Sequence, residues 1–161
     1  MSKSWTKGNV GRFWENEYKS FTYIKKKIYT PEGDLQDPKT YGWIYDNSNP
    51  MPDWLETFKR IFNLKNQTYT FYKMMPGEVM PTHQDHYQRY VDLFKAKYEN
   101  VCRAVIMLED WKPGHYFEID GQGIVNWVAG DYFLWKSDTP HAAANIGLED
   151  RYTLQITGGQ Y

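Results

Sequence analysis

From about residue 68 onward, the sequence alternates short apolar runs with turn-forming residues. The runs are rich in aromatic and β-branched residues, and Gly, Pro or Asp separates most of them, which is typical of β-strands joined by tight turns. About eight runs qualify as strands, and they cover residues 69–73, 82–85, 102–108, 115–119, 124–128, 132–135, 142–145 and 151–157. Many short strands with evenly spaced turns favour a mainly β fold of the sandwich or jelly-roll type over a parallel α/β sheet.

Two segments depart from this pattern because their apolar residues recur at helical spacing. Residues 53–63 follow the turn-rich stretch 46–52, and we expect them to form a helix that packs on the sheet and supports it. Residues 86–99 have the same spacing between two predicted strands, and they form either a lid over a site or an amphipathic helix packed on the sheet. The opening run 21–29 predicts a flanking strand whose lysines face water or protect a sheet edge.

The length and charge of the chain limit the number of domains and the kinds of partner that we expect. A chain of 161 residues fits one compact domain, and we expect residues 1–161 to form it. The 19 Lys and Arg balance 20 Asp and Glu, a net charge of −1, so no field attracts nucleic acid or an anionic membrane, and neither partner is expected. The sequence contains no membrane-spanning apolar run and does not begin like a signal peptide, which predicts an intracellular, cytoplasmic protein.

Cysteine and aromatic content add two points. The single cysteine, Cys102, lies in an apolar run, so we expect a buried thiol that forms no internal disulfide and has no catalytic role. Aromatic residues make up 18% of the chain. Such rings fill β-rich cores, but they also line clefts for sugars or peptides, so a non-catalytic binding module stays an alternative.

Three residues of metal-binding type have a spacing that favours a common site. His83 and Asp85 are two residues apart, so on an extended strand their side chains point to the same face. His141 begins another predicted strand. Two imidazoles and one carboxylate on one face of an octahedron leave the opposite positions open, as in non-haem Fe(II) oxygenases, which bind co-substrate and O₂ there. The pattern predicts an iron site, although a histidine considered alone is more often incidental.

Arg151 strengthens this hypothesis because of its position. It lies ten residues after His141 and opens the last predicted strand, beside the third ligand. A guanidinium binds a carboxylate through two parallel hydrogen bonds. Arg151 is therefore expected to hold the far carboxylate of a diacid that chelates the iron through its keto-acid end. The alternative is a surface ion pair with Glu149 or Asp150.

The order of an HxD pair, a distal histidine and an arginine about ten residues later, within a run of short strands, resembles the 2-oxoglutarate/Fe(II)-dependent dioxygenases. The fold of that superfamily is a double-stranded β-helix. Five segments are similar in order and spacing to its prolyl-hydroxylase branch: 71–77, 83–85, 104–111, 130–141 and 151–153. The resemblance covers about 68–158, which would be the core of the domain, with residues 1–67 as an N-terminal supporting region.

This resemblance implies a cofactor, two co-substrates and a role for several residues. The cofactor is Fe(II), and the co-substrates are 2-oxoglutarate and O₂. His83, Asp85 and His141 would hold the iron, and Arg151 would bind the distal carboxylate of 2-oxoglutarate. Tyr72 matches a tyrosine that often hydrogen-bonds the co-substrate in this branch, and an ordinary core tyrosine is the alternative.

Other polar residues of the predicted strands have less definite roles. Strand alternation places Thr153 and Gln155 on the face of Arg151, where either could donate a hydrogen bond to the same carboxylate. The sequence departs from the prolyl-hydroxylase pattern at Met107, where that branch often has a second tyrosine, so the contacts to the co-substrate would differ in detail. Arg103 is expected either to bind a substrate carboxylate at the mouth of the barrel or to form a surface ion pair.

Three further residues near the predicted site are assigned no chemistry. His86 follows the ligand pair but has the opposite parity on a strand, so we do not expect it to bind iron. His115 is expected to be structural or exposed, and Trp135 to belong to the core.

The activity implied by the resemblance is hydroxylation of an unactivated C–H bond, with 2-oxoglutarate converted to succinate and CO₂. Asp85 supports hydroxylation because halogenating relatives have a small residue in its place. A prolyl residue in a peptide or protein, a free amino acid and another small molecule all stay open as substrates. Two alternative functions are a cupin-like metal enzyme that needs no 2-oxoglutarate and a non-catalytic jelly roll that binds glycans or peptides.

Overall fold

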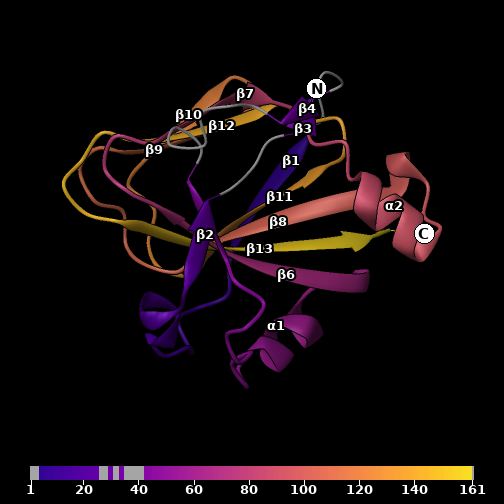
Figure 1. Ribbon diagram of the computed structural model, residues 1–161, viewed down its shortest axis with the longest axis horizontal. Helices are drawn as coiled ribbons and strands as arrows, with labels where there is room; N and C mark the ends of the chain where they lie inside the picture. The colour runs from indigo at the N-terminus through magenta and orange to yellow at the C-terminus, as the bar shows by residue number, and fades with distance from the viewer. Residues whose placement is uncertain (1–3, 26–28, 31–32, 35–41, 161) are drawn as a thin grey trace.

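The computed structural model describes residues 4–25, 29–30, 33–34 and 42–160. In this part of the chain the strands form a seven-stranded sheet, a four-stranded sheet and a short hairpin, all antiparallel (Figure 1). The larger sheet has the order β1 (Trp5–Asn9), β11 (Asp131–Lys136), β8 (Val101–Met107), β13 (Arg151–Gly159), β6 (Lys65–Met74), β5 (Trp43–Tyr45) and β2 (Tyr23–Lys25). The smaller sheet has the order β10 (Gln122–Ile124), β9 (His115–Ile119), β12 (His141–Asn145) and β7 (Val79–His83), and the hairpin joins β3 (Tyr29–Thr30) to β4 (Gly33–Asp34).

The path of the chain through the two sheets defines the fold. From β6 onward, successive strands alternate between the larger and the smaller sheet, except that β9 and β10 form a hairpin within the smaller one. This path is a double-stranded β-helix, and the mainly β, jelly-roll fold predicted from the sequence is confirmed.

The two faces of the larger sheet pack against different cores. On β8, Ala104 and Ile106 belong to an outer cluster under helix α1 (Leu55–Ile61), whereas Val105 and Met107 belong to an inner cluster between the sheets. A strand that is covered on both sides has no polar face, so it appears in the sequence as a continuous apolar run. The buried Cys102 lies on this strand, as expected.

The predicted helices form, but both are shorter than expected. The segment 53–63 contains α1, which buries Phe58 completely against the larger sheet. The segment 86–99 contains α2 (Gln88–Phe94) and the 3-10 helix η3 (Tyr98–Asn100), because Lys95 adopts a left-handed conformation that ends α2. Tyr90 of α2 packs on Val101 at the start of β8, so this helix packs on the sheet end rather than lying free as a lid.

Two predicted strands have different bounds in the structure. The strand expected at 82–85 is β7, which covers 79–83 and stops before Asp85. The run 124–128 was predicted wrongly as a strand: β10 stops at Ile124, and Asn126 has a positive φ of 61°. The run 21–29 contributes β2 and the first residue of β3, while residues 26–28 lie outside the described part of the chain.

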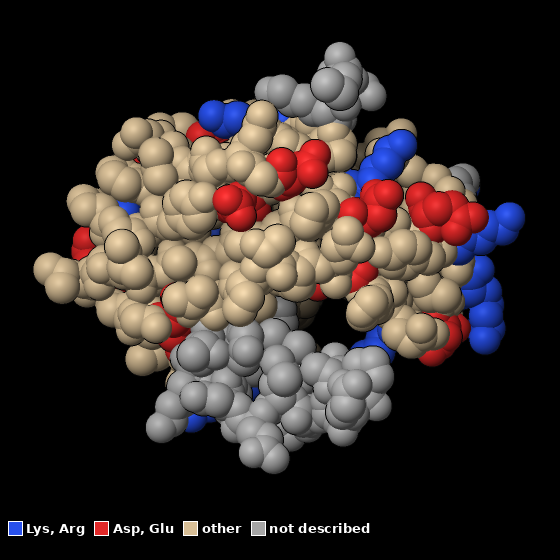
Figure 2. Space-filling view, turned by 90° about the horizontal axis from the view of Figure 1, so that it is seen from above, with Lys and Arg blue, Asp and Glu red and all other residues tan. Residues whose placement is uncertain are grey.

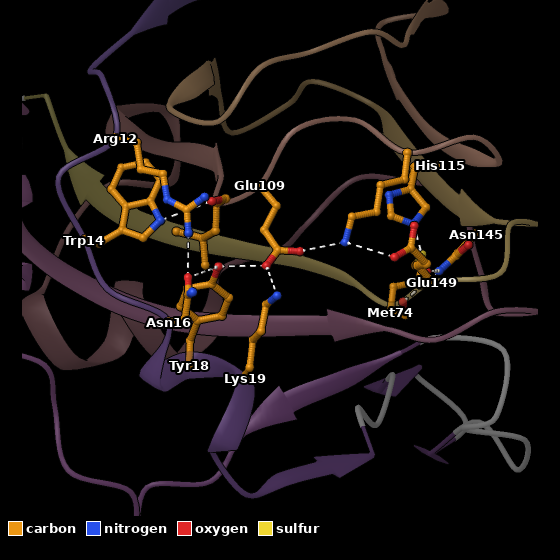
Figure 3. Close-up of polar contacts among 12 residues, drawn as sticks. Arg12, Trp14, Asn16, Tyr18, Lys19, Met74, Glu109, His115, Asn145 and Glu149 are labelled. Carbon is orange, nitrogen blue, oxygen red and sulfur yellow. Dashed lines mark hydrogen bonds and ion pairs between the residues drawn. The ribbon is translucent and has the colours of Figure 1, made fainter.

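The N-terminal region is built into the same core. Strand β1 pairs with β11 at one edge of the larger sheet, and the 3-10 helix η1 (Glu17–Ser20) buries Tyr18 completely. Glu109 accepts hydrogen bonds from Tyr18 Oη at 2.9 Å, Lys19 Nζ at 2.8 Å and Lys112 Nζ at 3.0 Å (Figure 3). Burial opposes ionisation of Glu109, but these three donors outweigh it and lower its pKa. This carboxylate therefore links the start of the chain to the β8–β9 connection.

The face that covers the smaller sheet is neither uniformly acidic nor uniformly basic. Figure 2 shows acidic side chains there in several small groups and basic side chains chiefly toward one end, with uncharged surface between them. Among the described residues, no helix is long and apolar enough to span a membrane.

Candidate metal centre

His83, Asp85 and His141 come together at one end of the space between the two sheets. Their candidate ligand atoms all lie within 4.8 Å of one another. His83 ends β7 and pairs directly with His141, which begins β12, and the two imidazole centroids are 4.3 Å apart. The chain continues past the end of β7 to Asp85, whose carboxylate lies 3.5 Å from His83 Nε2 and 3.1 Å from His141 Nε2. Two donors that bind one ion at right angles, with bonds of about 2.1 Å, lie about 3 Å apart, so the spacing fits a metal ion.

The hydrogen bonds of the two imidazoles prepare them as ligands. His83 Nδ1 lies 2.7 Å from the carbonyl oxygen of Pro81, and His141 Nδ1 lies 3.0 Å from that of Thr139. Because a carbonyl only accepts hydrogen bonds, Nδ1 is the donor on both rings, and a neutral ring then carries its lone pair on Nε2. Metal-binding histidines in proteins are oriented by such a bond on the opposite nitrogen. Both Nε2 atoms face Asp85, so the three residues present a converged donor set.

Asp85 is also paired with Arg103. The Arg103 Nη1 donates to Asp85 Oδ2 at 2.8 Å. Burial opposes ionisation of Asp85, but Arg103, His141 and His83 outweigh it and hold its pKa well below the usual range. The carboxylate is therefore ionised at neutral pH and is available to a cation. Arg103 is half-buried against Tyr87 rather than on the surface.

Arg151 lies at the other end of the same cavity and has an unusual environment. It is 8% exposed. Among the residues that the structure describes, its Nε has no hydrogen-bond partner, and the polar contact of its Nη1 is with the sulfur of Met74, at 3.9 Å. The rings of Phe117 and Trp127 pack on its guanidinium at 5.6 and 5.7 Å. No carboxylate among the described residues pairs with it. Burial lowers the pKa of Arg151 to about 10, so it still carries a charge at neutral pH.

The acidic neighbours that were considered as partners for Arg151 are engaged elsewhere. Lys112 Nζ lies 3.8 Å from Glu149, and Lys73 Nζ lies 3.8 Å from Asp150. The alternative of a surface ion pair for Arg151 is therefore not found in the described part of the chain. A buried guanidinium without a counter-ion costs free energy unless a ligand supplies the negative charge.

The cavity between these ends includes the other predicted site residues. The β13 register sets Thr153 opposite Tyr72 and Met107, and Gln155 opposite Val105. The Arg151 guanidinium lies over Phe117, which pairs with Ala143 on β12, two residues from His141. Its lining comprises Tyr72, Met74, Met80, His83, Arg103, Val105, Phe117, Trp135, His141, Ala142, Ala143, Arg151, Thr153 and Gln155.

The three residues without assigned chemistry have clear positions. His86 is exposed and is not part of the candidate metal-ligating group. His115 is buried, with Nε2 at 2.8 Å from the carbonyl oxygen of Glu149, and burial lowers its pKa. Trp135 belongs to the core, as expected, but its ring also packs on His141 with centroids 4.7 Å apart.

Sequence reasoning missed the contact between Trp135 and His141 and the shielding of Arg151 by Phe117 and Trp127. Strand parity places Trp135 with Phe133, but it does not reveal which strand of the other sheet lies across from them. The packing of the two sheets on each other determines these contacts.

The fold and the site together describe a double-stranded β-helix with a His-Asp-His candidate metal centre. A prolyl-4-hydroxylase from Pseudomonas putida is similar in structure, with a TM-score of 0.53 and 19% identity over 74% of this chain and 71% of that chain. At this identity the similarity supports the fold only.

Two further structures are similar at lower scores. One is a predicted oxalate decarboxylase from Thermotoga maritima, with a TM-score of 0.48 and 14% identity over 89% of this chain and 96% of that one. The other is SnoN, a non-haem α-ketoglutarate-dependent epimerase of nogalamycin biosynthesis, with a TM-score of 0.44 and 12% identity over 56% and 44%. No family model matches the sequence, and no curated protein does.

Proposed function

We propose that this protein is an Fe(II)- and 2-oxoglutarate-dependent dioxygenase that hydroxylates an unactivated C–H bond. The observation that carries the proposal is the pairing of two features in one cavity. His83 and His141 of the His-Asp-His donor group line it at one end, and a buried guanidinium without a carboxylate partner in the described chain lines it at the other. A metal alone would use only the first feature, whereas a diacid that chelates the metal would use both.

The donor set and the orphaned guanidinium both fit the groups that the proposal requires. Two imidazoles and one carboxylate are the ligands of non-haem Fe(II) oxygenases, and they leave coordination positions open. The Nε of Arg151 has no hydrogen-bond partner in the described chain, and an arginine can bind a carboxylate through two parallel hydrogen bonds. A cupin-like metal enzyme without a diacid would leave the cost of burying Arg151 uncompensated.

The residues of the chain have separate tasks in this proposal. His83, Asp85 and His141 hold the metal, and Arg151 binds the distal carboxylate of 2-oxoglutarate. When bound, Fe(II), 2-oxoglutarate and O₂ would supply the oxidation, in which one C–H bond becomes C–OH while 2-oxoglutarate and O₂ yield succinate and CO₂.

The residues between the two ends shape the co-substrate site. Thr153 and Tyr72 lie opposite each other on β13 and β6 and line the cavity, where each hydroxyl can donate a hydrogen bond to a bound carboxylate. Gln155 lies two residues further along the same face and is the third candidate donor. Phe117, Val105 and Trp135 exclude water from the cavity, which strengthens the attraction of Arg151 for an anion.

The substrate is proposed only as a class. A prolyl residue of a peptide, as in the prolyl hydroxylases that the sequence resembles, and a free amino acid are the two candidates to test first. Succinate release should be measured with proline, other amino acids and proline-containing peptides, each against a sample without substrate. Stimulation by one compound identifies the class.

An anaerobic titration tests the proposal directly. Fe(II) followed by 2-oxoglutarate should produce a visible charge-transfer band in the wild-type protein. The His141→Ala variant should lack this band because it lacks a ligand, and Arg151→Leu should need far more 2-oxoglutarate to reach it. Binding of Fe(II) without any effect of 2-oxoglutarate would instead support a cupin-like metal enzyme, and binding of glycan or peptide without metal would support a non-catalytic module.

A further inference from the structure

Arg103 is held from three sides, unlike Arg151. Its Nη1 donates to Asp85 Oδ2 at 2.8 Å, and its Nε and Nη2 lie 3.2 and 3.1 Å from Thr157 Oγ1. Its guanidinium lies 4.7 Å from the centroid of the Tyr87 ring. The β8 register explains this arrangement, because Arg103 is opposite Thr157 on β13 and opposite Trp135 on β11. The donors of Arg103 are thus directed at the chain itself.

Asp85 depends on such an anchor because it is not part of a strand. Strand β7 ends at His83, and the backbone carbonyl of Asp85 accepts a hydrogen bond from Tyr98 Oη at 3.2 Å. Within the described residues, the carboxylate of Asp85 contacts only the two histidines and Arg103. If His83 and His141 turn their Nε2 lone pairs to a metal, Arg103 is the contact that still fixes the carboxylate.

We propose that Arg103 is a positioning residue for the metal centre: by binding Oδ2, which also lies 3.1 Å from His141 Nε2, it fixes the orientation in which the Asp85 carboxylate faces the metal. This inference rests on the proposed metal site. A carboxylate has two oxygens, so the ion pair and a metal bond can exist together. Residues that orient a metal ligand typically change metal affinity by about 10- to 100-fold when they are replaced.

The direction in which metal affinity changes when Arg103 is replaced distinguishes a positioning role from a purely electrostatic one. Arg103 carries a positive charge close to the ligands, and if it acted only through this charge, its removal would tighten the binding of a divalent cation. If it positions Asp85, its removal weakens binding, because the carboxylate is free to rotate. These two roles therefore predict changes in opposite directions.

The experiment uses the metal alone and four variants of the full chain. Mn²⁺ binding is measured by isothermal titration calorimetry and by electron paramagnetic resonance, whose line shape reports the ligand geometry. Arg103→Gln should bind Mn²⁺ about 10- to 100-fold more weakly and change the line shape. Arg103→Lys should recover part of the affinity because it keeps a donor near Asp85. Thr157→Val removes only the second anchor of Arg103, so it should cost less than Arg103→Gln does.

Arg89→Gln is the matched control, because Arg89 is exposed on the nearby helix α2 and the substitution removes the same charge. It should change the affinity by less than about twofold, since exposed charges are screened. Circular dichroism checks that each variant is folded. If Arg103→Gln does not fold, the metal affinities of Arg103→Lys and Thr157→Val still test the positioning role.

The possible outcomes separate this inference from the proposed function. Failure of the wild-type protein to bind Mn²⁺ or Fe²⁺ would remove the metal site and the proposed function with it. Wild-type binding together with equal or tighter binding by Arg103→Gln would overturn only the positioning role. Unchanged metal affinity with a raised KM for the substrate would show that Arg103 binds substrate instead.

Discussion

Replacing Arg151 by Met should make the ligand-free protein more stable while removing the affinity for 2-oxoglutarate that we propose. The reason is that the buried guanidinium has no anionic partner in the described chain, so the folded protein bears the cost of removing this charge from water. Methionine has a similar length and no charge, and it can pack on Phe117 and Trp127, which now cover the guanidinium.

The size of the effect follows from the environment of Arg151. Burial lowers its pKa from 12.5 to about 10, and at about 1.4 kcal/mol per pH unit this corresponds to about 3 kcal/mol. A cation whose folded-state pKa is lowered destabilises the fold wherever it is charged in both states, so the whole cost applies at neutral pH. The two lost ring contacts lie near the outer limit for a cation–π interaction, at 5.6 and 5.7 Å, so they offset only about 0.5–1 kcal/mol each. A net gain of about 1–2 kcal/mol should raise Tm by roughly 2–8 °C for a domain of this size.

Thermal unfolding of the metal-free protein measures this gain, with Arg103→Met as the matched comparison. Arg103→Met leaves Asp85 without its cation and should lower stability by about 2–4 kcal/mol. Adding 2-oxoglutarate to the Mn²⁺-loaded protein should raise Tm of the wild type further, because a ligand that binds only the folded state stabilises it. Arg151→Met should respond to Mn²⁺ but show no further rise with 2-oxoglutarate. The reasoning fails if Arg151→Met unfolds at a lower temperature than the wild type and 2-oxoglutarate stabilises both proteins equally.

Three further outcomes are expected. His141→Ala should abolish both Fe(II) binding and substrate-coupled succinate release, and normal turnover in this variant would disprove the metal site. Glu109→Gln should lower the free energy of unfolding by about 1–2 kcal/mol at pH 7, because it weakens the bonds to Lys19 and Lys112. The folded-state pKa of Glu109 is lowered, so chemical denaturation should show this difference in stability above the ordinary pKa of 4.5. The difference should disappear as the pH falls below that value. Cys102, whose thiol pKa is raised by burial, should react with a thiol reagent only after denaturation, and rapid reaction of the native protein would contradict its packing.

The sequence predicted the barrel strands well because their pattern is local. Alternation and turn residues are visible within a few positions, and they located seven of the predicted runs within the strands β6, β7, β8, β9, β11, β12 and β13 or at their ends. The run 124–128 failed because apolar residues there are not all buried: Val125 is 47% and Val128 53% exposed, whereas Trp127 is 4% exposed. An apolar run does not by itself show which of its residues face a core.

Strand β1 was missed because it has no apolar alternation and its partner is far away in the chain. It contains Gly8, which pairs with Tyr132, and a Cβ at Gly8 would lie 2.4 Å from the Tyr132 ring. The tyrosine covers the glycine, so the strand is stabilised by a residue more than a hundred positions later. Such a pairing cannot be recognised from the composition of the strand alone.

In the candidate site, too, the sequence shows the type of each residue but not which residues lie beside it in the fold. Arg103 and Arg151 are both arginines on barrel strands, and the sequence suggested that either could bind a carboxylate. The structure distinguishes the two arginines. Arg103 forms an ion pair with Asp85, whereas the acidic residues next to Arg151 in sequence, Asp150 and Glu149, pair with Lys73 and Lys112. An anion that enters the cavity therefore gains most at Arg151, and the electrostatics favour a ligand whose negative end lies there and whose other end reaches the metal ligands.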